Sequence, residues 1–120
     1  MNKNLLIVIG VGLLAALSWV LFSSAPAKSG QYDLFAQCLS TKGVIMYGAN
    51  WCSHCQNEKK AFGDSFRFVN YVECPKNTKE CVAKGVEGYP TWIFPDGKKL
   101  IGEQGLGGLA EASGCALPTN

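Results

Sequence analysis

Hydrophobic residues are distributed unevenly along this chain: residues 5–22 form one uncharged, mostly apolar run, and short apolar and polar segments alternate after it. As a helix rising about 1.5 Å per residue, the run would extend roughly 27 Å, just enough to cross a bilayer. With Lys3 before it, we expect residues 1–22 to form an N-terminal transmembrane helix whose N-terminus is cytoplasmic. A cleaved signal peptide is the alternative, because residues 25–27 supply small side chains at the usual spacing for cleavage before Lys28.

Residues 23–31 are rich in Ser, Ala and Gly and have no apolar period, which is typical of a linker. Residues 32–120 should form the folded domain, in which the period of the apolar positions changes from segment to segment. Helix and strand patterns alternate and end in a hairpin and a last helix, which predicts an α/β sandwich of about four strands in a mixed sheet flanked by helices. The expected helices are residues 33–42, 56–66, 77–84 and 106–113, and the expected strands are residues 44–47, 68–73, 91–94 and 98–101.

Composition limits the partners and the compartment. The 120 residues hold 11 Lys/Arg against 9 Asp/Glu, with no basic stripe, so we expect no nucleic-acid partner. Six cysteines in so short a chain indicate an oxidising compartment, where disulfides persist. We therefore expect a single-pass protein of the cell membrane with its domain on the outer, extracytoplasmic face, or a secreted or periplasmic domain after signal cleavage.

Cys52 and Cys55 stand three residues apart between an expected strand and an expected helix. Two sulfurs at this spacing can close a reversible disulfide, and the free amides and dipole of a helix N-terminus stabilise a thiolate on the first of them. Cys52 is the expected nucleophile and Cys55 the resolving partner. His54, the single histidine, would favour the Cys52 thiolate as a cation or hydrogen-bond donor; a solvated turn histidine is the alternative. Two alternatives remain for the pair: a fixed structural disulfide, or a metal site formed by these three side chains. One Cys-x-x-Cys is weak evidence for zinc, so we expect no metal and no cofactor.

The motif Trp51-Cys52-Ser53-His54-Cys55 and the later Gly88-Tyr89-Pro90-Thr91 together resemble the thioredoxin-like family over about residues 32–115. The whole run of residues 47–92, which includes both motifs, is most similar to the thioredoxin-like domain fused to, or found beside, bacterial vitamin K epoxide reductase homologues. This resemblance implies an extracytoplasmic thiol-disulfide oxidoreductase with Pro90 in a cis peptide bond beside the cysteine pair. It also implies that the backbone at Tyr89 pairs with the substrate chain, and we expect Trp51 and Thr91 to contribute to the same substrate site.

One position departs from the family pattern. Thioredoxins carry a buried carboxylate six residues before the first motif cysteine, and this chain has Met46 there. Glu58, one helical turn after Cys55, could replace this base, but an exposed helix carboxylate is the expectation. Lys59 and Lys60 are likewise expected on a solvated helix face.

Four further cysteines remain after Cys52 is paired with Cys55. Cys74 and Cys81 lie seven residues apart, which favours a local bridge and matches a second pair in the resembled domains; Cys38 and Cys115 then follow by elimination. Two alternatives stay open: Cys74 and Cys81 as a second redox pair that relays electrons to the first, and Cys38 as a buried free thiol.

The hypothesis from the sequence is therefore a membrane-tethered oxidant of thiols in exported proteins. A vitamin K epoxide reductase-like membrane protein would reoxidise it. A dedicated extracytoplasmic reductant, and a disulfide-stapled metal chaperone or binding module, are the alternatives.

Overall fold

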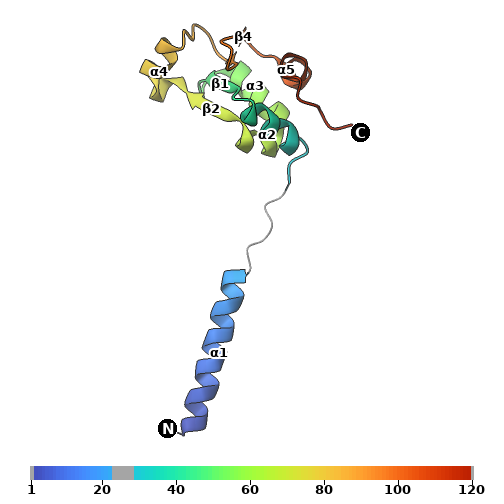
Figure 1. Cartoon of the computed structure of the whole chain (residues 1–120). Helices are drawn as coiled ribbons and strands as arrows, with labels where there is room; N and C mark the ends of the chain where they lie inside the picture. The colour runs from blue at the N-terminus through green and yellow to red at the C-terminus, as the bar shows by residue number, and fades with distance from the viewer. Residues whose placement is uncertain (1, 23–28, 120) are drawn as a thin grey trace.

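The computed structural model describes residues 2–22 and 29–119, and for residues 14–22 it describes the backbone alone (Figure 1). The chain alternates helices and strands in the expected order, with two short 3-10 segments, η1 and η2, added. The helices are α1 (Lys3–Phe22), α2 (Asp33–Thr41), α3 (Ser53–Phe62), α4 (Thr78–Ala83) and α5 (Gly105–Ser113). The strands are β1 (Ile45–Gly48), β2 (Asn70–Glu73), β3 (Thr91–Ile93) and β4 (Lys99–Ile101), and the 3-10 segments are η1 (Gly63–Phe68) and η2 (Cys74–Lys76).

The four strands form one mixed sheet in the order β2-β1-β3-β4. β1 runs parallel to β2, with Met46 opposite Tyr71, and antiparallel to β3, with Met46 opposite Trp92. β3 and β4 form the expected antiparallel hairpin. This mixed sheet with its helices fits the expected thioredoxin-like α/β fold.

The main core lies where α2, α3 and α5 meet the sheet. The ring centroid of Phe62 lies 5.8 Å from that of Phe35 and 6.1 Å from that of Trp92, so three aromatic residues from α2, α3 and β3 pack together. The buried members of this cluster also include Cys52 and Cys55, whereas Tyr47, Cys74 and Cys81 form a second, smaller cluster. α3 packs against η1 and α5, and Cys52 and Cys55 bury its start in the same cluster, so the core holds the start of α3 in place.

The expected transmembrane helix is wrong. A helix that crosses a bilayer needs about 20 consecutive, mostly apolar residues, and within the described residues no helix is long and apolar enough to do so. Residues 23–28, which hold most of the expected linker and the alternative cleavage site, lie outside the described residues.

The helix expected over residues 56–66 is also shifted. α3 begins at Ser53 and ends at Phe62, because Gly63 adopts a φ of +57° that only glycine reaches easily. Phe66 therefore lies in η1, from where its ring still contacts Phe62 edge-on.

Candidate active site

The two motif cysteines lie at the first turn of α3. Cys52 is the N-cap residue, with extended backbone dihedrals, and the N–H of Cys55 donates to its Sγ across 3.3 Å. Both cysteines are free; Cys52 is 8% exposed and Cys55 is completely buried. An N-cap sulfur faces the free amides of the first helical turn, which stabilise negative charge. Of the two sulfurs, Cys52 is thus the one placed to react with another molecule.

Cys55 is held as a thiol. Burial, followed by its hydrogen bond with Cys52, raises the pKa of Cys55 to about 12, although a backbone hydrogen bond from Ala49 and, to a lesser extent, the charge of Lys59 lower it in part. Desolvation acts in this direction because the charged thiolate loses its hydration inside the protein. At neutral pH, Cys55 must therefore gain or lose a proton whenever the disulfide opens or closes.

The second motif lies directly beside Cys52. The Tyr89–Pro90 peptide bond is cis, and the Sγ of Cys52 lies 3.6 Å from the carbonyl oxygen of Tyr89. Trp51 is 72% exposed, and its ring meets the Tyr89 ring edge-on, with the centroids 5.9 Å apart. Thr91 lies beneath the surface and donates its hydroxyl to Gly88 O. The structure thus brings Trp51, Tyr89 and Pro90 together around Cys52 and leaves Thr91 below them.

His54 is exposed, and its Nδ1 lies 2.8 Å from Oε2 of Glu103. This hydrogen bond, followed by one from Asn57, lowers the pKa of Glu103. The imidazole of His54 thus pairs with Glu103, and an effect of His54 on Cys52 stays a prediction. Glu103 had no signal in the sequence, because 49 residues separate it from His54.

Glu58 is buried, so its expected exposure is wrong. Its side chain is 1% exposed, its Oε2 accepts from the indole N–H of Trp92, and its Oε1 accepts from the backbone N–H of Gly105, both across 2.6 Å. Gly105 is the first residue of α5, whose free amides and positive dipole end favour a carboxylate. Glu58 therefore links α3, β3 and α5 inside the core.

Replacing Glu58 with alanine is expected to destabilise the fold by about 2–5 kcal/mol, because two donors, Trp92 Nε1 and Gly105 N, lose a buried partner. Denaturant unfolding measures this free energy. Glu111→Ala, which removes an exposed carboxylate from α5, is the matched control and should stay within about 0.5 kcal/mol of the parent. Equal losses in the two variants would contradict the prediction.

Lys59 also departs from the expected solvated face. Its side chain is half-buried, and its Nζ lies 3.9 Å from the ring centroid of Tyr71 and 5.5 Å from that of Phe66. The hydroxyl of Tyr71 donates to Glu73, and burial, followed by this hydrogen bond, raises the pKa of Tyr71. Lys60, in contrast, is exposed as expected.

The remaining cysteines form two bridges, Cys38 with Cys115 and Cys74 with Cys81. Cys74 and Cys81 are 2% and 4% exposed. A bridge so well buried has little access for an attacking thiol, which weakens the relay alternative. The alternative of a free Cys38 thiol is wrong.

Within the described ranges, no three His, Cys, Asp or Glu side chains are grouped as metal ligands would be.

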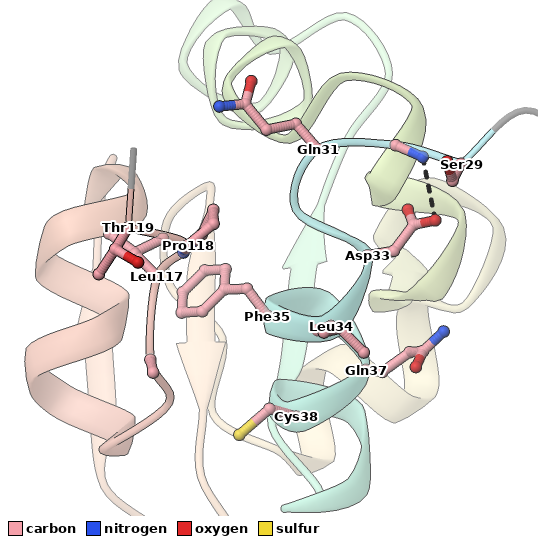
Figure 2. A pocket seen from close by; sticks show the side chains of 12 residues that line it. Ser29, Gln31, Asp33, Leu34, Phe35, Gln37, Cys38, Leu117, Pro118 and Thr119 are labelled. Atoms are coloured by element: carbon pink, nitrogen blue, oxygen red, sulfur yellow. Dashed lines mark hydrogen bonds between the residues drawn. The ribbon is translucent and has the colours of Figure 1, made fainter.

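A cavity of about 920 Å³ lies away from the cysteine pair, between the start of α2 and the C-terminal segment (Figure 2). In Figure 2 the ring of Phe35 points toward Leu117 and Pro118, and Cys38 lies at the same cavity. Neither Cys52 nor Cys55 lines it. The cavity is therefore separate from the cysteine pair at the start of α3.

No protein-family model matches this chain. The chain is similar to the thiol-disulfide oxidoreductase LTO1 of Arabidopsis thaliana, with 42% identity over 101 residues. The match covers 76% of this chain but 27% of the relative, so the chain spans about a quarter of that protein's length. The name of the relative agrees with the enzyme class that the cysteine motif predicts.

Proposed function

We propose that this protein, which is similar over most of its length to a thiol-disulfide oxidoreductase, is itself an enzyme of that class that works through Cys52 and Cys55. One observation carries the proposal: Cys52 is the N-cap of α3, within hydrogen-bond reach of the Cys55 amide and beside the carbonyl of Tyr89. A reactive sulfur at a helix start, paired with a buried second sulfur, is the arrangement that reversible exchange requires.

In the proposed direction, the oxidised enzyme carries a Cys52–Cys55 disulfide. A client thiolate attacks the Sγ of Cys52; the Cys52–Cys55 bond breaks, and Cys55 leaves with the electron pair and takes up a proton. A second client thiolate then attacks the client sulfur of the mixed disulfide, which frees Cys52 as a thiolate. The client gains a disulfide and loses two electrons, which the enzyme holds as the reduced pair.

The proposed clients are thiol-containing proteins exported to an oxidising compartment. Two further disulfides, one closing a separation of 77 residues, support an extracytoplasmic location, because such bridges persist where thiols are not kept reduced. For reoxidation we propose a vitamin K epoxide reductase-like membrane protein. The resemblance of residues 47–92 to domains that accompany such proteins supports this partner.

The reduction potential of the Cys52–Cys55 pair tests the direction of electron flow. We expect a value above roughly −200 mV, where oxidants and isomerases lie, because stabilising the Cys52 thiolate stabilises the reduced form. The full chain is equilibrated in glutathione buffers, and the two cysteines are scored by alkylation and mass. A potential below roughly −250 mV would contradict the oxidant proposal and favour a dedicated reductant.

A further inference from the structure

The resolving cysteine, Cys55, lies where the usual internal base is missing. Met46, at the position of that base, is completely buried and apolar. Cys55 nevertheless changes its protonation in every cycle if the proposed function holds, and burial disfavours its thiolate. A backbone hydrogen bond from Ala49 favours the thiolate in part, and a nearby cation adds to this effect. The titratable groups that face Cys55 and its surroundings are Cys52 and Lys59 on α3, Tyr71 and Glu73 on β2, and Lys76 on η2.

Of these groups, Lys59 is the cation that α3 places on the same side as Cys55. It stands four residues after Cys55 on α3, and side chains at this spacing lie on the same helix face. Its Nζ lies over the Tyr71 ring and 3.4 Å from Oδ1 of Asn50. The N–H of Asn50 in turn donates to Glu73. These contacts hold the ammonium group of Lys59 near the start of α3.

Because Gly48 has no side chain, the Tyr71 ring can lie close to the Cys55 sulfur. A β-carbon at Gly48 would lie 2.9 Å from Cys55 Sγ and 3.1 Å from the Tyr71 ring. The absence of this carbon lets the sulfur and the ring share one small space at the end of β1. The ring that carries Lys59 thus lies next to the buried sulfur.

We propose that Lys59, held on the Tyr71 ring, is a positioning residue that stabilises the thiolate of Cys55 during exchange and so takes over part of the role of the missing buried base. The inference rests on the proposed function. Cys55 is a thiolate both when it leaves Cys52 and when it attacks Cys52 to close the disulfide. A fixed positive charge favours both steps. It stabilises the negative charge that develops on Cys55 as it leaves, and it raises the fraction of Cys55 that is thiolate before it attacks.

The reaction of the full chain with Ellman's disulfide tests this inference. Cys52 and Cys55 are reduced beforehand, and the two structural disulfides are left intact. The Cys52 thiolate attacks the reagent, which forms a mixed disulfide and releases one thionitrobenzoate. Cys55 then loses its proton to solvent and attacks Cys52 Sγ; the Cys52–Cys55 bond forms, the mixed disulfide breaks, and a second thionitrobenzoate leaves. The first phase reports Cys52, and the second reports Cys55.

Lys59→Met keeps the aliphatic stem against the aromatic rings and removes the charge. We expect it to slow the second phase by about threefold to thirtyfold between pH 6 and 9. This range follows from the roughly tenfold to thousandfold loss of thiolate that removing a neighbouring opposite charge causes, partly offset because a more basic thiolate is a better nucleophile. Lys59→Arg should recover most of the rate. The first phase should stay at the parent rate in both variants.

Lys60→Met is the matched control, because it removes the same charge from the neighbouring, exposed position of α3. It should leave both phases unchanged. Equal second phases in Lys59→Met and Lys60→Met, or no recovery in Lys59→Arg, would overturn the inference. Thermal melts establish that each variant folds, and Lys59→Gln serves as a second neutral variant that must slow the phase similarly. If the parent chain itself releases fewer than two thionitrobenzoates, the proposed function fails instead.

Discussion

Serine in place of Cys52 is expected to reduce thiol-disulfide exchange to the uncatalysed background. Cys52 is the sulfur at the N-cap of α3, and a serine hydroxyl there neither ionises at neutral pH nor forms a disulfide. Cys55 cannot replace it, because Cys55 is completely buried and its pKa is raised to about 12. The measurement is the rate at which small amounts of the oxidised chain introduce disulfides into a reduced, unfolded protein, with disulfide formation followed by mass.

Cys55→Ala is the informative counterpart, because it leaves Cys52 able to attack but removes the sulfur that resolves the mixed disulfide. Covalent adducts should accumulate through Cys52 in this variant and disappear in the Cys52→Ser chain. Substantial exchange in Cys52→Ser would contradict the assignment of the nucleophile. Adducts of the Cys55→Ala chain in cells also test the reoxidation partner: a vitamin K epoxide reductase-like membrane protein supports it, and soluble clients alone count against it.

The elements that the sequence predicts well are those whose pattern is local. The buried strand before Trp51, the hairpin around Pro95-Asp96-Gly97 and the helix closed by Gly114 all depend on the periodicity of neighbouring residues and on turn residues. The structure has a strand at Ile45–Gly48, antiparallel strands around that turn, and left-handed backbone at Gly114. The positions of Cys52 and Cys55 follow from the same local logic, because a strand-to-helix turn places the first cysteine at the helix start.

The features that the sequence does not predict are contacts between residues far apart in the chain. Glu58 and Lys59 read as exposed positions on a polar helix, because the pattern of α3 says nothing of Trp92, Gly105 or Tyr71. Those partners come from β3, α5 and β2 and lie between 12 and 47 residues away from the side chain they contact. Two side chains that a helical pattern assigns to solvent therefore lie against other elements of the fold, Glu58 fully buried and Lys59 half-buried.

The asymmetry between the cysteines follows from the same packing. The reactivity of Cys52 depends on its place at the helix start, which any chain with this strand-to-helix turn would supply. The reactivity of Cys55 depends on the side chains around it, because burial raises its pKa and the charge of Lys59 opposes that effect. When the reduced chain reacts with a disulfide, changes at Cys52 should therefore act on the first step of exchange, and changes at Lys59 on the resolving step.

Removing the Cys38–Cys115 bridge is expected to destabilise the fold by about 4.5 kcal/mol, against about 2.5 kcal/mol for the Cys74–Cys81 bridge. The first bridge closes a sequence separation of 77 residues and the second a separation of 7, and the loop entropy withheld from the unfolded chain grows with the logarithm of this length. The two double alanine variants are a matched pair, since each removes two sulfurs and one cross-link. Denaturant unfolding, with Cys52 and Cys55 kept reduced, measures both free energies. A larger loss in the Cys74/Cys81 variant would contradict the entropic account and would mean that the small cluster around Tyr47 depends on its bridge for packing.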